Sequence, residues 1–205
     1  MIDIFEKPKL DLNNLICHSG GAVGSDQIFE QTSKEFGVKT RAYSYKTGYH
    51  NSPNKVEISE EDYLEGVQMI KKANLTLNRW GINKYMNLLA RNWAQVKYSN
   101  QIFAIGTIIE PGKKCHKGYQ NKSKYQIVAG GTGYCCQMGI DNYRDVFVFD
   151  QSKNKWYRWS YTINSFLEIK DILKIEVQNF AGVGTREINE SGILAIKNLY
   201  FKTFS

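Results

Sequence analysis

The stretch Leu15-Ile16-Cys17-His18-Ser19-Gly20-Gly21-Ala22-Val23-Gly24-Ser25-Asp26 determines how the rest of the chain is interpreted. It predicts a short buried strand that ends at paired glycines, with Ser25 and Asp26 at the N-cap of the next helix. Glycine lets backbone N–H groups approach a phosphate, and the positive end of a helix favours negative charge. The stretch therefore indicates an anion site, although the same pattern also occurs as a tight connection without a ligand.

The succession of strand, glycine turn and helix is expected twice more along the chain. Residues 101–109 form a nearly continuous apolar run, as in a central parallel strand, and residues 130–133 are a glycine turn that opens a helix. Residues 175–180 predict a strand, residues 181–185 a third glycine turn and residues 186–201 a closing helix. Turns of this kind all lie at the carboxyl edge of a parallel sheet, where ligands bind. We therefore expect the three turns to converge on one site.

The remaining elements complete an α/β pattern. Residues 38–45 predict a strand after the first helix, and two helices are expected between residues 59 and 98. A lysine-rich insertion occupies about residues 110–126, and about residues 145–160 predict an edge β-hairpin. The sequence thus predicts a three-layer α/β fold with a mostly parallel sheet, as a single domain over residues 1–205.

Composition narrows the classes of partner. The net charge of +7 favours an anionic partner, either a nucleotide or nucleic acid. The chain holds no stretch near the roughly 20 apolar residues of a membrane span, so no membrane association is expected. Its four cysteines lack paired C-x-x-C spacing, which favours reduced thiols in a cytoplasmic protein. Whether the chain forms a homodimer through its helices is left open.

Several spaced motifs resemble those of the SLOG superfamily of Rossmann-like nucleotide-binding domains. This group includes the Lonely Guy phosphoribohydrolases, the DNA-processing protein A fold and small phage proteins. Residues 19–26 resemble the S-G-G-A-x-G-x-D motif of the phage and DNA-processing branch. Residues 89–96, the strand after them and the turn at 130–133 resemble the helix, strand and G-G-x-G turn that follow in the family. Residues 181–187 resemble the G-S-R turn that normally opens the family's first strand.

That last motif lies near the C-terminus, so the resemblance implies a circularly permuted, phage-type member that covers most of residues 14–200. It also implies binding of a nucleotide or nucleotide-derived molecule by a sensor or sequestering protein. Backbone N–H groups and hydroxyls would contact phosphate or ribose oxygens, Arg186 would bind a phosphate, and Asp26 or Glu187 would accept ribose hydroxyls. The expected ligand-binding residues are Ser19, Gly20, Gly21, Gly24, Ser25, Asp26, Gly130, Gly131, Thr132, Gly133, Gly182, Gly184, Thr185, Arg186 and Glu187. Asp26 could instead be only an N-cap, and Arg186 with Glu187 only a solvated first turn.

An enzymatic alternative comes from the Lonely Guy branch, which cleaves the base from nucleoside monophosphates with an arginine and a glutamate. Arg91 matches the arginine position, but no carboxylate follows the turn at residues 130–133, where the helix continues Tyr134-Cys135-Cys136-Gln137. A carboxylate stabilises the oxocarbenium-like state of glycosidic cleavage, so its absence favours binding over hydrolysis. On a helical wheel Arg91 lies opposite Trp93, so it could instead be a solvent-facing arginine.

A second alternative is binding of single-stranded nucleic acid. The insertion interleaves lysines with tyrosines, and residues 156–159 could offer a stacking face. The insertion is also placed to close over a nucleotide as a lid, which we favour. We expect no cofactor and no metal site, because the pairs Cys17–His18 and Cys115–His116 have no usual zinc spacing.

Overall fold

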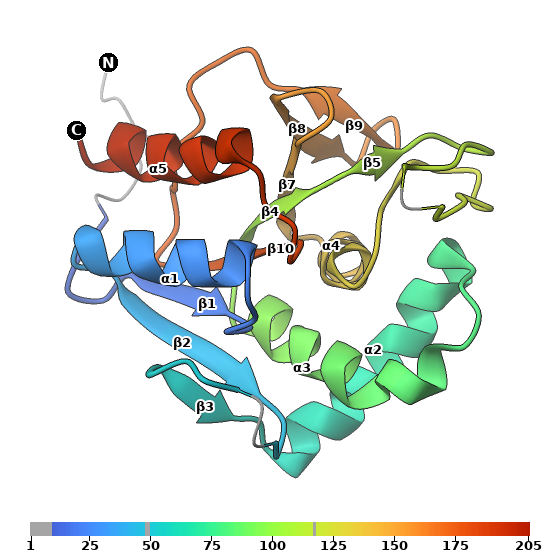
Figure 1. The fold of residues 1–205 in the computed structure, drawn as a ribbon, viewed down its shortest axis with the longest axis horizontal. Helices are drawn as coiled ribbons and strands as arrows, with labels where there is room; N and C mark the ends of the chain where they lie inside the picture. Colours follow the sequence, from blue (N-terminus) through green and yellow to red (C-terminus); the bar gives the residue numbers. More distant parts are fainter. Residues whose placement is uncertain (1–9, 48–49, 117) are drawn as a thin grey trace, which may run out of the picture.

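The protein is an α/β structure built on one eight-stranded sheet (Figure 1). The computed structural model describes residues 10–47, 50–116 and 118–205. The strands of the sheet are β1 (Ile16–Ser19), β2 (Lys39–Ser44), β3 (Lys55–Glu57), β4 (Gln101–Gly106), β7 (Asp145–Asp150), β8 (Lys155–Ser160), β9 (Ser165–Glu168) and β10 (Asn179–Gly184). Their order is β3-β2-β1-β10-β4-β7-β8-β9, parallel from β3 to β7 and antiparallel at β8 and β9. The mostly parallel α/β sheet expected from the sequence is confirmed.

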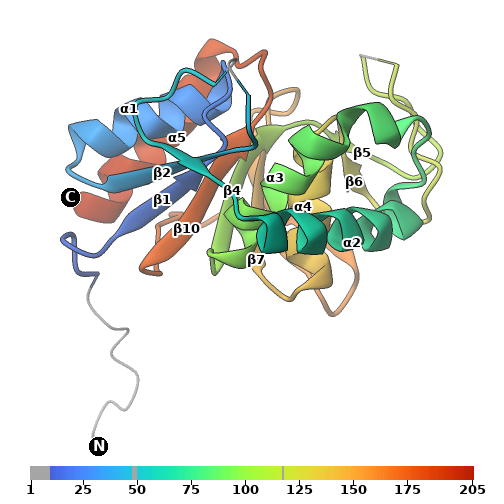
Figure 2. The same cartoon turned by 90° about the horizontal axis from the view of Figure 1, so that it is seen from below.

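Helices cover both faces of the sheet (Figure 1 and Figure 2). One face carries α1 (Ser25–Glu35) and α5 (Glu190–Phe204) over a core that includes Phe103 and Phe180. The other face carries α2 (Glu60–Leu77), α3 (Met86–Lys97) and α4 (Thr132–Asp141), with a 3-10 turn, η1 (Ile82–Tyr85), before α3. Two hydrophobic cores therefore share one sheet.

Local sequence explains how these elements begin and why they are buried. The Ser59 hydroxyl accepts a hydrogen bond from the Asp62 N–H at 3.0 Å, and three acidic residues in the first turn of α2 suit the positive end of that helix. All six residues of β4 are buried, as its apolar sequence predicts for a strand covered on both faces. The edge hairpin is also confirmed, with β8 paired antiparallel to β7.

The first helix starts slightly earlier than expected. Gly24, rather than Ser25 or Asp26, is the N-cap of α1, and no side chain caps this end. Gly24 has a φ of +100°, and a Cβ at this position would lie 2.6 Å from the Cα of Arg186. Glycine is therefore required here by the backbone conformation and by the neighbouring chain.

The insertion leaves the end of β4 and returns to it. Strands β5 (Ile108–Ile109) and β6 (Ile127–Val128) pair antiparallel in a small separate sheet, and residues 110–126 lie between them. Lys117 lies outside the described residues. The Ala129 N–H donates to the Thr107 carbonyl at 2.9 Å, which brings the chain back to the sheet edge. The strand directly before the second glycine turn is thus β6 of this small sheet, while the central strand expected over residues 101–109 ends in the main sheet at Gly106.

The largest difference from the sequence prediction lies at β10. Residues 181–185 are expected as a glycine turn, but residues 181–184 are the last four of the six residues of this central strand, and α5 begins at Glu190 rather than at residue 186. A Cβ at Gly182 would lie 2.8 Å from the Cβ of buried Phe29, and one at Gly184 would lie 2.6 Å from the Cβ of Ser25. These glycines let α1 pack closely on the strand, and only Gly184 is at its end.

Within the part of the chain that the structure describes, we find no helix with both the length and the apolar character needed to cross a bilayer.

Candidate functional site

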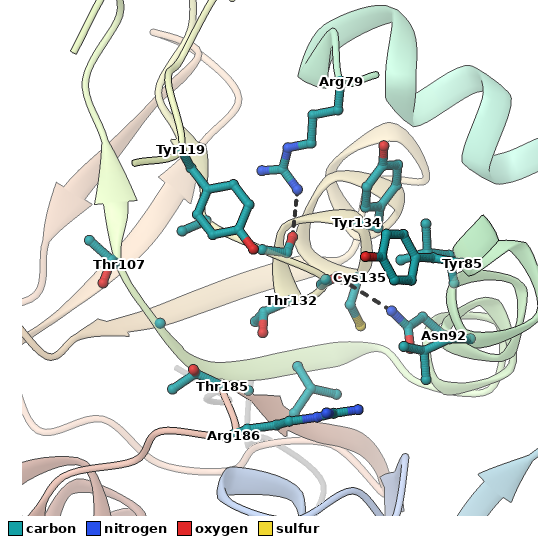
Figure 3. Close-up of a pocket in the computed structure, with 18 of the residues that line it drawn as sticks. Arg79, Tyr85, Asn92, Thr107, Tyr119, Thr132, Tyr134, Cys135, Thr185 and Arg186 are labelled. Atoms are coloured by element: carbon teal, nitrogen blue, oxygen red, sulfur yellow. Dashed lines mark hydrogen bonds between the residues drawn. The ribbon is translucent and has the colours of Figure 1, made fainter. Parts of the chain in front are cut away.

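A cavity of about 850 Å³ opens at the carboxyl edge of the sheet, between the ends of β10 and β4 (Figure 3). The chain leaves β10 toward α5 on one face of the sheet, and it leaves β4 toward α4 on the other face. Connections that diverge in this way leave a crevice at the strand ends, and this is the usual ligand position in open α/β sheets. Gly106 and Thr107 of the β4 end and Val183 and Gly184 of β10 line the cavity.

The second glycine turn places the start of α4 in this cavity. Gly130, Gly131 and Thr132 line it, whereas Gly133 is buried behind them. Gly130 has a φ of +63°, and a Cβ built there would meet no atom within 4 Å. The first N–H groups of a helix lack partners within the helix, and its positive dipole end favours anions. The Gly133 and Tyr134 N–H groups already donate to the Gly130 and Gly131 carbonyls at 3.1 and 3.0 Å, so an anion at this open turn would meet the N–H groups of Gly131 and Thr132.

Arg79 fixes the position of this turn. Its guanidinium donates to the carbonyls of Gly130 and Val128 and lies over the Tyr134 ring, 5.3 Å from the ring centroid. The Tyr134 hydroxyl in turn donates to the Asn74 side chain at 2.7 Å. Burial lowers the pKa of Arg79 from its ordinary value, but an arginine remains charged in proteins. Arg79 is thus a positioning residue that also adds positive charge to the cavity wall.

The side chains of the first glycine turn, residues 19–26, mostly form hydrogen bonds with other groups of the protein. The Ser19 hydroxyl donates to Glu30 at 3.0 Å and accepts the Gly21 N–H at 3.1 Å. The Ser25 hydroxyl donates to the Thr185 carbonyl at 2.8 Å. Of the residues expected to bind ligand from this turn, Asp26 lines the cavity. The others are not among the described residues of the cavity wall: Ser19, Gly20, Gly21, Gly24 and Ser25.

Asp26 joins the first turn to β10. Its Oδ1 accepts the Gly184 N–H at 3.0 Å, and its Oδ2 accepts the Ala22 N–H at 3.4 Å. Burial raises the pKa of Asp26 to about 6, against the opposing effect of the Arg91 charge and these two hydrogen bonds. The carboxylate is therefore not the N-cap of α1, and it links two of the expected site segments.

Arg91 is buried, which corrects the solvent-facing alternative. Its side chain donates to the Gly20 carbonyl and, at 3.4 Å, to the Tyr43 carbonyl. Burial lowers its pKa, whereas the Asp26 carboxylate raises it. The helical wheel failed because α3 packs against α2, α4 and β2 and is buried from Leu89 to Val96. Arg91 lines the cavity, and one of its nitrogens, Nη1, makes both of these backbone contacts.

The third expected segment, residues 181–187, reaches the cavity through its last residues. Thr185, Arg186 and Glu187 line the cavity together with Gly184, while Gly182 packs on α1 outside the described cavity wall. The Thr185 Oγ1 accepts the Glu187 N–H at 3.3 Å. Arg186 is exposed, and Figure 3 shows it entering the cavity from the β10 side while Thr132 enters from the α4 side.

Several cavity residues were not expected from the sequence. They are Arg79, Tyr85, Asn92, Gln95 and Thr107, whereas Tyr119 belongs to the insertion that we expect to close over a nucleotide. Asn92 lies three residues after Leu89 and four before Val96, so helical spacing placed this amide on the buried stripe and could have identified it. Arg79 follows the end of α2 in a loop, and no sequence pattern marks it.

The tryptophan hairpin does not form the stacking face considered for nucleic acid. Trp159 is 6% exposed and packs edge-on against Phe166, and Trp156 packs edge-on against Phe103 and Phe149. Arg158 of the same strand pairs with Asp145. The aromatic rings of this hairpin are therefore used mainly in the core.

In the described ranges, no three histidine, cysteine, aspartate or glutamate side chains gather as ligands for a metal ion. Comparison with known proteins gives no match to any family model, curated protein or solved structure.

Proposed function

We propose that this protein binds a nucleotide or nucleotide-derived small molecule in the cavity between β10 and β4, as a sensor or sequestering protein. The observation that carries the proposal is that the start of α4 and Arg186 line the same cavity from different elements. Helix N-termini and arginine side chains are the two groups that proteins most often use for phosphate. The cavity volume of about 850 Å³ is within the usual range for small-molecule sites.

We further propose that the chain is a circularly permuted member of the SLOG superfamily, and its strand order is that of the wider Rossmann-like class. If β10 is counted as the first strand, the others follow outward in chain order on both sides. Strands β1, β2 and β3 lie on one side, and β4 and β7 lie on the other. A doubly wound nucleotide-binding sheet has this arrangement, with its ligand at the point where the order reverses.

Isothermal titration calorimetry tests the binding proposal directly. The panel contains inorganic phosphate, ribose 5-phosphate, the nucleoside monophosphates and a single-stranded oligonucleotide. Arg186→Ala should weaken binding of the phosphate compounds by about 10- to 100-fold, the usual effect of losing one charge-assisted hydrogen bond. Lys197→Ala, which removes an exposed charge from the outer part of α5, is the matched control and should leave affinity unchanged. Equal affinity of the Arg186 variant and the control would contradict the site.

A nucleoside monophosphate phosphoribohydrolase is the second candidate. The observation that favours it is the Asp26 carboxylate, which lines the cavity together with Arg91. Both Asp26 oxygens accept backbone N–H groups, so the carboxylate is held in place rather than free to move. Chromatography of the same monophosphates after incubation tests this activity. Release of free base that Asp26→Asn abolishes would establish the hydrolase, and intact nucleotide would exclude it.

A further inference from the structure

Two exposed tyrosines from segments outside the glycine motifs line the cavity. Tyr85 is 53% exposed and lies at the N-cap of α3, and Tyr119 is 45% exposed and lies in the insertion. Figure 3 shows the two side chains to either side of Thr132. They come from positions 34 residues apart in the chain, so the fold itself brings them to one cavity.

These tyrosines differ from the other tyrosine of the cavity wall. Tyr134 is 3% exposed, its hydroxyl donates to Asn74, and the Arg79 guanidinium lies over its ring. Both the hydroxyl and the ring of Tyr134 therefore make contacts that hold the glycine turn at residues 130–133. Tyr85 and Tyr119 instead line the cavity while about half exposed, and the Lys84 ammonium lies 5.2 Å from the centroid of the Tyr85 ring, which leaves the other face of that ring for a ligand. Aromatic surface that stays exposed at a pocket is typical of a contact reserved for a ligand.

The charged and aromatic groups of the cavity come from different segments. The anion groups are the start of α4 and Arg186, whereas the tyrosines belong to the insertion and to the connection between α2 and α3. A ligand that satisfies both sets has a phosphate and a flat ring in one molecule. Planar bases stack on tyrosine rings with little dependence on base identity.

We propose that Tyr85 and Tyr119 form a base subsite, so that the ligand is a nucleoside phosphate held by stacking at its base and by α4 and Arg186 at its phosphate. This inference rests on the proposed function. It assigns the insertion a direct role in ligand recognition, with Tyr119 as its contact residue.

Calorimetry with ribose 5-phosphate, AMP and UMP separates the two subsites. The wild-type protein should bind AMP at least about 10-fold more tightly than ribose 5-phosphate, because one stacked base contributes that much. Tyr119→Ala and Tyr85→Ala should each weaken AMP binding by about 5- to 100-fold and leave ribose 5-phosphate binding unchanged. Tyr119→Phe and Tyr85→Phe should retain AMP affinity, since the ring is preserved. The control is Tyr143→Ala, an 84% exposed tyrosine outside the described cavity wall.

The outcomes distinguish this inference from the proposed function. If AMP and ribose 5-phosphate bind wild type equally, or if both alanine variants retain AMP affinity, the base subsite is wrong while phosphate binding stands. If neither AMP, UMP nor ribose 5-phosphate binds, the proposed function fails and the base subsite fails with it. Unchanged thermal denaturation of the variants confirms that any lost affinity comes from the removed ring.

Discussion

Replacing Arg91 with alanine should destabilise the whole fold. The side chain is 6% exposed and donates to the carbonyls of Gly20 and Tyr43. Its positive charge also opposes the effect of burial on the pKa of Asp26, which is 5% exposed. Without the guanidinium, the Asp26 carboxylate stays buried with no compensating charge from α3, and the Gly20 carbonyl loses a donor.

The expected loss is large relative to the stability of a typical domain. Leaving a buried polar or charged group without its partner costs about 1–3 kcal/mol, from a total free energy of unfolding of about 5–15 kcal/mol. The loss should shrink at low pH, because protonation of Asp26 removes the uncompensated charge. We therefore expect a smaller difference between variant and wild type at about pH 5 than at about pH 8.

Urea denaturation followed by circular dichroism measures these free energies. Arg186→Ala is the control, since this exposed arginine should change stability by no more than about 0.5 kcal/mol. The double variant Arg91→Met with Asp26→Asn should be less destabilised than the sum of its single variants, because it removes both charges together. Should Arg91→Ala prove as stable as Arg186→Ala, the structural role of this arginine is refuted and a purely catalytic role regains support.

Two further predictions concern packing and pH. Gly182→Ala should lower the free energy of unfolding by about 1–3 kcal/mol, because the new Cβ overpacks the core at Phe29. Gly131→Ala is its control in urea denaturation, since that Cβ would meet only Leu89 at 3.9 Å, and equal stability of the two variants would contradict the packing argument. The Asp26 pKa is raised from 3.8 to about 6, so the folded state binds this proton more tightly than the unfolded chain does. Its contribution to stability should be present below about pH 4 and fall by about 3 kcal/mol as pH rises through about 6, and an Asp26→Asn variant that keeps this part of the wild-type pH profile would refute the assignment.

Sequence patterns whose physical cause lies within a single segment predicted the fold well. The acidic first turn after Ser59 and the apolar run from residue 101 identified α2 and β4 without reference to the rest of the chain. The turn predicted at residues 181–185 was wrong over residues 181–184, because the reason for the glycines there lies in another segment. Phe29 and Ser25 of α1 occupy the space where side chains would be, and nothing in the local sequence reveals that contact.

The candidate site was predicted less completely for the same reason. The start of α4, Asp26 and Arg186 could be expected, since each follows a glycine motif. Arg79 could not, because it reaches the cavity from a loop that no sequence pattern marks, whereas Tyr119 belongs to an insertion whose place near the ligand could be expected from the sequence.

The first two glycine turns look alike in sequence, but their surroundings assign them different roles. A Cβ at Gly21 would meet the His50 ring, and the Ser25 N–H at the start of α1 already donates to the Thr185 carbonyl at 3.1 Å. The space beside this turn is therefore filled by protein, and its glycines serve internal packing. A Cβ at Gly130 would have no protein atom within 4 Å, and a Cβ at Gly131 would have its nearest neighbour, Leu89, at 3.9 Å. The Gly133 and Tyr134 N–H groups of α4 donate to the Gly130 and Gly131 carbonyls, but the approach to the turn itself is open. We therefore expect an anionic ligand to meet the N–H groups of Gly131 and Thr132, while the Ser25 N–H of α1 holds the end of β10 in place.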